Sequence, residues 1–170
     1  MIDIRTVSTK TAHTFLDAYH PLRTGGSLRG ALHILAGYEG GWPTFLAVFT
    51  TPRSRWRNYP VTLELSRLAW SPLAKASAST FLRKCLRMLR REHCGVVSAC
   101  GGTLIVTYAL PGTDGIVYER AGFSHNGYSG GCAWSHRGPG ERLTPDTIGT
   151  GRKLKRFFAP LGPDDTGGMG

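Results

Sequence analysis

The spacing of apolar residues along the chain changes between the two-residue period of strands and the longer period of helices. Apolar runs and alternating stretches predict strands, which fall at residues 2–7, 31–38, 44–50, 61–70, 104–109 and 123–128. Apolar residues three and four apart predict helices, which fall at residues 9–19, 77–92 and 116–121. The order of elements is therefore β-α-β-β-β-α-β-α-β, which is typical of a mixed α/β domain.

The arrangement of these elements predicts one sheet. Residues 104–109 form an almost continuous apolar run, as expected of a strand buried on both faces. We therefore expect an α/β, single-domain protein with a mixed, mostly antiparallel sheet, residues 104–109 inside it and the helix 77–92 packed on one face. A chain of 170 residues fits one domain, which we assign to residues 1–160, with residues 161–170 as a disordered tail.

The charge of the chain is strongly positive. Lys and Arg number 21 against 11 Asp and Glu, a formal net charge of +10. Arg outnumbers Lys by 16 to 5, and the guanidinium fork suits bidentate contacts with phosphates and base edges. The composition predicts a polyanionic partner, most often nucleic acid. The candidate contact residues are Arg53, Arg55, Trp56, Arg57, Arg137, Arg142, Arg152, Lys153, Lys155 and Arg156.

Membrane and metal partners are not indicated. No apolar run reaches the roughly 18 residues of a membrane span, and residues 1–10 lack the apolar segment of a secretory signal. We therefore expect an intracellular, cytoplasmic protein. Zinc ligands are available at Cys94, Cys100, Cys132 and His136, but no C-x-x-C pair is present. We interpret the cysteines, including Cys85 on the apolar side of its helix, as small buried thiols and assign no metal ligand.

The connection between the strand 61–70 and the helix 77–92 favours phosphate binding. Small residues open the helix, whose first N–H groups and positive dipole end attract anions. GNAT acyltransferases hold the pyrophosphate of acyl-CoA in this way, although their Arg/Gln-x-x-Gly-x-Gly/Ala signature is absent here. An ordinary capped helix is the alternative. The candidate cofactor-binding residues are Ser66, Ser77, Ser79 and Thr80.

Five polar residues near predicted strand and helix ends are candidates for catalysis: His20, Arg67, Tyr108, Asp114 and Tyr118. Arg67 interrupts an apolar strand segment, so it requires an acidic partner, a ligand or a phosphate, unless the strand is an edge and Arg67 reaches solvent. For the others, a helix C-cap at His20, an N-cap at Asp114 and a packed aromatic at Tyr118 are the alternatives.

These segments together resemble the Mom family of bacteriophage DNA-modification proteins, a divergent branch of the GNAT fold. The match rests on residues 19–20 after the first helix, residues 64–68 followed by 78–82, residues 106–109, and residues 115–123 followed by Gly127. It spans residues 12–130. The resemblance implies a GNAT-like sheet whose central strands splay apart near Arg67 and Tyr108.

The resemblance also implies an activity and a partner, which is double-stranded DNA. The activity is addition of a carbamoylmethyl-type group to the N6 amine of adenine in that DNA, which protects phage DNA from restriction inside the infected bacterial cell. Residue by residue, Arg67 matches the family's strand arginine, Ser79 or Thr80 its helix-start hydroxyl, Tyr118 its last tyrosine and His20 its early histidine. Leu110 stands where the family has an aspartate, so we expect Asp114 to supply that carboxylate.

A mechanism follows from these roles. A stacked adenine must be flipped into the site, and Asp114 or His20 is expected to remove an amine proton. Arg67 would hold an anionic part of the donor, and Tyr118 would orient the leaving group. Acyl-CoA is the donor implied by the fold, and a metal ion has been considered for the family. The alternative functions are a GNAT N-acetyltransferase acting on a small molecule or protein, and a non-catalytic DNA-binding module.

Overall fold

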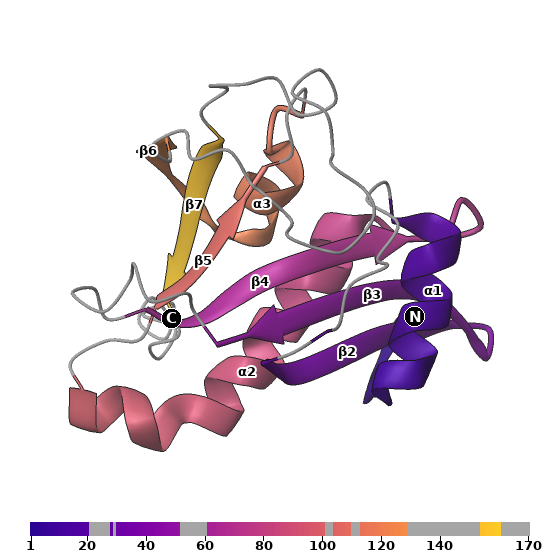
Figure 1. Cartoon of the computed structure of the whole chain (residues 1–170), viewed down its shortest axis with the longest axis horizontal. Helices are drawn as coiled ribbons and strands as arrows, with labels where there is room; N and C mark the ends of the chain where they lie inside the picture. The colour runs from indigo at the N-terminus through magenta and orange to yellow at the C-terminus, as the bar shows by residue number, and fades with distance from the viewer. Residues whose placement is uncertain are drawn as a thin grey trace, which may run out of the picture.

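The computed structural model describes residues 1–20, 28, 30–51, 61–100, 104–109, 113–128 and 154–160, without the side chains of residues 61, 62 and 93–100. Within these ranges the chain forms one seven-stranded sheet and three helices (Figure 1). The elements are β1 (Asp3–Thr6), α1 (Thr9–Tyr19), β2 (Ala31–Glu39), β3 (Trp42–Thr50), β4 (Val61–Trp70), α2 (Ala78–Cys100), β5 (Leu104–Tyr108), α3 (Ile116–Ala121), β6 (Ser124–Tyr128) and β7 (Lys155–Pro160).

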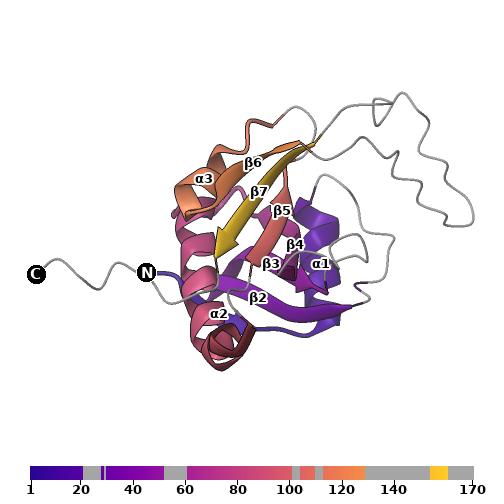
Figure 2. The same cartoon turned by 90° about the vertical axis from the view of Figure 1, so that its left-hand side faces the viewer.

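The strand order is β1-β2-β3-β4-β5-β7-β6. Every neighbouring pair is antiparallel except β4 and β5, which are parallel. The expected mixed, mostly antiparallel sheet is therefore confirmed, and β5 lies inside it between β4 and β7. Helix α1 covers one face of the sheet, here called the α1 face, whereas α2 and α3 cover the opposite α2 face (Figure 2).

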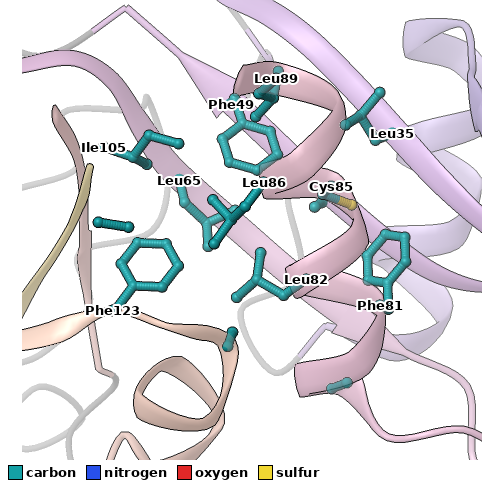
Figure 3. Packing of buried hydrophobic residues seen from close by; sticks show 14 of the residues in the cluster. Leu35, Phe49, Leu65, Phe81, Leu82, Cys85, Leu86, Leu89, Ile105 and Phe123 are labelled. Atoms are coloured by element: carbon teal, nitrogen blue, oxygen red, sulfur yellow. The ribbon is translucent and has the colours of Figure 1, made fainter. Parts of the chain in front are cut away.

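The larger core lies between α2 and the sheet. The buried side chains of α2 are Phe81, Leu82, Cys85, Leu86 and Leu89, the predicted apolar stripe of this helix (Figure 3). The Phe81 ring stacks on Phe45 of β3 with 5.1 Å between the centroids. At Gly37 of β2, an added Cβ would lie 2.8 Å from the Phe81 ring. Only glycine lets α2 approach the sheet this closely.

The predicted end of α2 is wrong. The helix continues past residue 92 to Cys100. Gly95 lies within the added segment, but a single glycine disfavours a helix by only about 1 kcal/mol. A paired stop signal comes only at Gly101 and Gly102. The helix therefore continues until two glycines follow each other.

One strand was not predicted. β7 enters the sheet between β5 and β6, with Phe157, Phe158 and Ala159 buried. Its sequence begins with Lys155 and Arg156 and ends at Pro160, so no alternation extends far enough to indicate a strand. Two predicted DNA-contact residues, Lys155 and Arg156, thus belong to the sheet. The assigned tail at residues 161–170 lies outside the described ranges.

No helix in the described part of the chain is long and apolar enough to cross a membrane.

Substitution of Gly37 by alanine tests the contact between α2 and the sheet. We expect Gly37→Ala to lower the free energy of unfolding by about 1–3 kcal/mol, because the new Cβ overlaps the Phe81 ring. In a Phe81→Leu background the same substitution should destabilise less. Denaturant unfolding of the two single variants and the double variant measures this coupling, and additive effects would contradict the overlap.

Candidate functional site

The central feature of the site is the point where β4 and β5 separate. The two strands pair at Val61–Leu104, Leu63–Ile105 and Glu64–Val106. Beyond these pairs β4 pairs only with β3, and β5 pairs only with β7. The last link between β4 and β5 is a buried hydrogen bond in which the Thr107 hydroxyl donates to the Leu65 carbonyl at 3.1 Å. The predicted splay near Arg67 and Tyr108 is confirmed.

A β-bulge in β4 lies beside this separation. Leu65 pairs with Phe49 and Arg67 with Val48, so Ser66 is an extra residue on β4. The Ser66 hydroxyl donates to the Val48 carbonyl at 3.2 Å, and Arg67 Nη1 donates to the Ser66 carbonyl at 2.7 Å. Arg67 is half-buried and lies in the part of β4 that pairs with β3 alone, so both interpretations of this residue stay predictions. The predicted cofactor contact of Ser66 stays a prediction, because its hydroxyl here joins β4 to β3.

Glu64 is a site residue that the sequence analysis did not identify. It is 4% exposed, and its Oε2 atom has no hydrogen-bond partner among the described residues. A buried carboxylate without a partner is strongly disfavoured unless a proton or cation accompanies it. The alternation of apolar and polar residues in β4 placed Glu64 on a polar face. The sequence pattern does not indicate that the face of the sheet on which Glu64 lies is covered by other parts of the protein.

Tyr118 of α3 reaches the separation point from the α2 face. Its ring packs against Phe157 at 5.4 Å and Phe123 at 6.0 Å between centroids. Its hydroxyl interacts with that of Thr107, and this interaction lowers the pKa of Tyr118 and partly offsets the effect of burial. Burial raises the pKa of Tyr118 above its ordinary value of 10.0, so the phenol is protonated at neutral pH.

Asp114 lies just before α3 and caps its first turn. Its Oδ1 accepts a hydrogen bond from the Ile116 N–H at 3.1 Å. Between them Gly115 has a φ of +80°, and a Cβ there would overlap the Phe157 ring. Asp114 therefore precedes the helix that carries Tyr118 and does not lie on it. Its proposed catalytic role stays a prediction, and Leu110 lies outside the described residues.

His20 and Tyr108 occupy the ends of their elements. His20 is buried at the C-cap of α1, where its backbone N–H donates to the Leu16 carbonyl at 2.8 Å. Tyr108 is the last residue of β5 and packs beside Val106 and Phe158. Arg67 and Tyr108 thus flank the separation of the strands, whereas His20 ends the helix that covers the α1 face. Their catalytic roles remain predictions.

The loop between β4 and α2 binds a carboxylate of the same chain, that of Glu39. The two carboxylate oxygens of Glu39 accept hydrogen bonds from the N–H groups of Lys75 and Ala76, each at 3.0 Å. Burial alone would raise the pKa of Glu39, but these bonds and one with Thr44 lower it below its ordinary value. Two consecutive backbone donors of this loop are therefore already occupied by a carboxylate.

The predicted hydroxyl residues gather at the start of α2. Ser77 Oγ accepts from the Thr80 N–H at 3.2 Å and contacts the hydroxyls of Ser79 and Thr80 at 3.0 and 2.9 Å. Ser77 is thus the N-cap of this helix, as the capped-helix alternative expected. The backbone N–H groups of Ser77, Ala78 and Ser79 donate to no acceptor in the described part of the chain. These three donors, at a positive helix end, fit a phosphate group.

Most of the predicted DNA-contact residues fall outside the described ranges: Arg53, Arg55, Trp56, Arg57, Arg137, Arg142, Arg152 and Lys153. Of the other two, Lys155 Nζ donates to the Asp114 carbonyl at 3.2 Å. Arg156 donates to the Asn126 carbonyl and Oδ1 at 2.9 and 3.0 Å. Both side chains thus connect β7 to neighbouring segments, and their contact with DNA stays a prediction.

No metal-binding group of three His, Cys, Asp or Glu residues occurs among the side chains that the structure describes. This statement does not cover Cys94 and Cys100, whose side chains are not described. It also does not cover Cys132 and His136, which lie outside the described ranges.

Solved structures share this fold at low sequence identity. An N-acetyltransferase from Staphylococcus aureus Mu50 has a TM-score of 0.62 and 14% identity, over 95% of this chain and 98% of that one. The ribosomal-protein-S18-alanine N-acetyltransferase from Escherichia coli has a TM-score of 0.58 and 14% identity, over 100% of both chains. A GNAT family acetyltransferase from Elizabethkingia anophelis with acetyl-CoA bound has a TM-score of 0.59 and 11% identity, over 92% and 96%. The chain therefore has the GNAT acetyltransferase fold. No protein-family model and no curated protein sequence matches it.

The raised pKa of Tyr118 predicts a pH dependence of stability. The folded-state pKa lies above the unfolded value near 10, so the contribution of Tyr118 is fully present below about pH 10. It is lost as the pH rises through the folded-state pKa. As the pH rises above about 10, denaturant unfolding should show a larger loss of stability in the wild type than in Tyr118→Phe. The exposed Tyr128→Phe should behave like the wild type, and parallel curves for all three proteins would contradict the prediction.

Proposed function

We propose that this chain is a GNAT-type acyltransferase that moves an acyl group from acyl-CoA to an amine. The observation that carries the proposal is the pair of proton-handling groups at the separation of β4 and β5. Glu64 is a buried carboxylate on β4, between two leucines of the core beneath α2, and therefore lies on the α1 face, whereas Tyr118 is a protonated phenol on the α2 face. An acid and a base on opposite sides of the opening between two strands suit a reaction in which one group gains a proton and another loses one.

The chain fits acyl-CoA in part. The N–H groups of Ser77, Ala78 and Ser79 would hold a phosphate at the start of α2. The family's Arg or Gln is replaced by Lys75, and Glu39 occupies the N–H groups of Lys75 and Ala76. When bound, acyl-CoA supplies an activated thioester. Support also comes from neighbours of the same fold, whose structures contain acetyl-CoA or coenzyme A.

The residues around the separation point have distinct roles in the proposed reaction. Tyr118 carries a phenol proton at neutral pH, which would protonate a leaving group. Glu64 accepts the proton that an attacking amine must lose. Thr107 keeps β4 and β5 from separating further, because its hydroxyl holds the Leu65 carbonyl. Sequence reasoning assigned the base to Asp114 or His20. Asp114 Oδ1 already accepts the Ile116 N–H, whereas Glu64 is a buried carboxylate beside the separation, so we take Glu64 as the base.

A second candidate acceptor is the N6 amine of adenine in DNA, as in the Mom-type modification. The observation that favours it is the net charge of +10, which a small-molecule acetyltransferase does not require. The exocyclic amine is a weak nucleophile inside the base stack, so the base would have to be flipped into the site. In this form of the proposal, the group transferred is of the carbamoylmethyl or acyl type.

Tyr118 provides the test of the acyltransferase proposal. With acetyl-CoA and a panel of amines, release of free thiol measures turnover. We expect Tyr118→Phe to lower kcat by about 10²- to 10⁴-fold, because the phenol proton is lost while the ring packing remains. Tyr128→Phe, on the exposed strand β6, should retain full activity. An unchanged kcat in Tyr118→Phe, or no thiol release with any amine, would overturn the proposal.

Nucleoside analysis distinguishes modification of adenine in DNA from the alternative functions. DNA from cells that express the protein should contain a new adenine adduct by mass spectrometry, and the Tyr118→Phe variant should abolish it. Charge reversal at Arg55 and Arg57 should weaken DNA binding and reduce its salt dependence. If the nucleosides are unmodified and small amines are acylated, only the first candidate remains, which is acyl transfer to an amine other than adenine. DNA binding without adduct or thiol release would instead indicate a non-catalytic DNA-binding module.

A further inference from the structure

A cavity of about 920 Å³ lies beside the start of β3 and the end of β4. Its walls come from α1, the turn between β2 and β3, and the loop between β4 and α2, which lie at one end of the sheet (Figure 1). Its lining residues, all within the described ranges, include none from β5, α3 or β7. Small-molecule sites in proteins span roughly 300–1,000 Å³, so the cavity has the size of a ligand site.

Exposed apolar side chains gather in this cavity. Leu73 is 80% exposed, Trp42 76% and Tyr19 40%, and all three line it. The ring of Phe15, which lies 4.8 Å from that of Tyr19 between centroids, forms part of the same wall. Single exposed hydrophobic residues are common, but several in one hollow indicate a surface that a ligand covers. The flat faces of Trp42 and Tyr19 suit an aromatic ring in particular.

The acidic side chain of the cavity is already neutralised by hydrogen bonds. Glu39 lines the cavity, but its two oxygens accept the N–H groups of Lys75 and Ala76 at 3.0 Å each. A cationic ligand would have to compete with these two backbone donors for the carboxylate. The cavity therefore does not favour a cation.

The basic side chains of the cavity are available to a ligand. Lys10 and Lys75 line it, and neither ammonium group forms an ion pair or a hydrogen bond with any residue in the described ranges. Lys84 and Lys155, the other lysines with described side chains, donate to the carbonyls of neighbouring segments. The two lysines without such a bond thus both belong to the cavity, which favours an anion.

We propose that this cavity binds an aromatic anion, with its ring against Trp42 and Tyr19 and its carboxylate or phosphate beside Lys10 or Lys75. Two sources share this chemistry: an aryl carboxylate, and a nucleotide, in which a base carries a phosphate. The inference goes beyond the proposed acyl transfer and does not depend on it, because neither Glu64 nor Tyr118 lines the cavity.

Matched pairs of ligands test the recognition. Naphthoate and naphthylmethanol share a ring but differ in charge, as do adenosine monophosphate and adenosine. In calorimetric titrations we expect at least one anion to bind about threefold or more tightly than its neutral counterpart, as exposed ion pairs contribute up to about fivefold in affinity. The tighter of the two anions identifies the carboxylate or the nucleotide as the source. Equal affinities within both pairs, or no binding of either anion, would overturn the inference.

Variants of Trp42 test the ring contact. Trp42→Ala should weaken binding of the preferred anion and of its neutral counterpart by about fivefold or more, because stacking on the indole is lost. Trp70→Ala is the matched control, since Trp70 is also exposed but does not line the cavity, and its affinities should match the wild type. Unchanged binding in Trp42→Ala would place the ligand elsewhere and overturn the assignment.

Lysine variants test the charge contact. A double variant, Lys10→Gln with Lys75→Gln, should remove the preference for the anion and change the affinity for the neutral counterpart by less than about twofold. The control, Lys84→Gln with Lys155→Gln, loses the same charge outside the cavity and should keep the preference. Equal losses in both double variants would show an effect of net charge alone and contradict the proposal. Thermal unfolding of each variant checks that the fold is retained.

Competition with coenzyme A separates the cavity from the proposed acyl-CoA site. With coenzyme A in excess, the affinity for the preferred anion should change by less than about twofold. Displacement of the anion by coenzyme A would overturn the assignment of a separate site. If coenzyme A itself does not bind, the proposed acyl transfer fails, and the comparison of Trp42→Ala with Trp70→Ala still decides whether the cavity binds the anion.

Discussion

The separation of β4 from β5 is the constraint on which the rest of the site depends. β4 keeps its pairing with β3 to Trp70, whereas its pairing with β5 ends at Glu64. The backbone groups of β4 that would have bonded to β5 need other partners, because buried N–H and C=O groups are rarely left unsatisfied. Thr107 supplies one such partner for Leu65. Because Tyr118 interacts with the same threonine, the position of Thr107 determines both the opening between the strands and the placement of the phenol.

Much of the fold was predictable because its signals are local. The continuous run in β5, the alternation in β4 and the apolar stripe of α2 each depend on a few consecutive residues. β7 was missed because its first two residues are charged and its strand character comes from packing between β5 and β6. The last turns of α2 were missed because the apolar stripe that predicts this helix ends at Leu89.

The site was less predictable because it depends on register. Arg67 and Tyr118 could be singled out from their sequence neighbours, but the bulge at Ser66 exists only relative to Val48 and Phe49 on β3. Without that register, Glu64 looked like one of several polar residues on a solvated face. The contact of Glu39 with Lys75 and Ala76 joins segments that no spacing rule connects. The N-capping role of Asp114 could be considered from its position just before the helix 116–121, because that signal is local.

The position of β7 has a consequence for how the chain assembles. β1 to β4 each pair with the strand next to them in sequence, so that half of the sheet forms as the chain is made (Figure 1). β5 and β6 have only α3 between them in sequence, yet they are separated in the sheet by β7, which is translated later. During synthesis one edge of β5 therefore remains open beside the site, and the aromatic residues under Tyr118 gather only when Phe157 arrives.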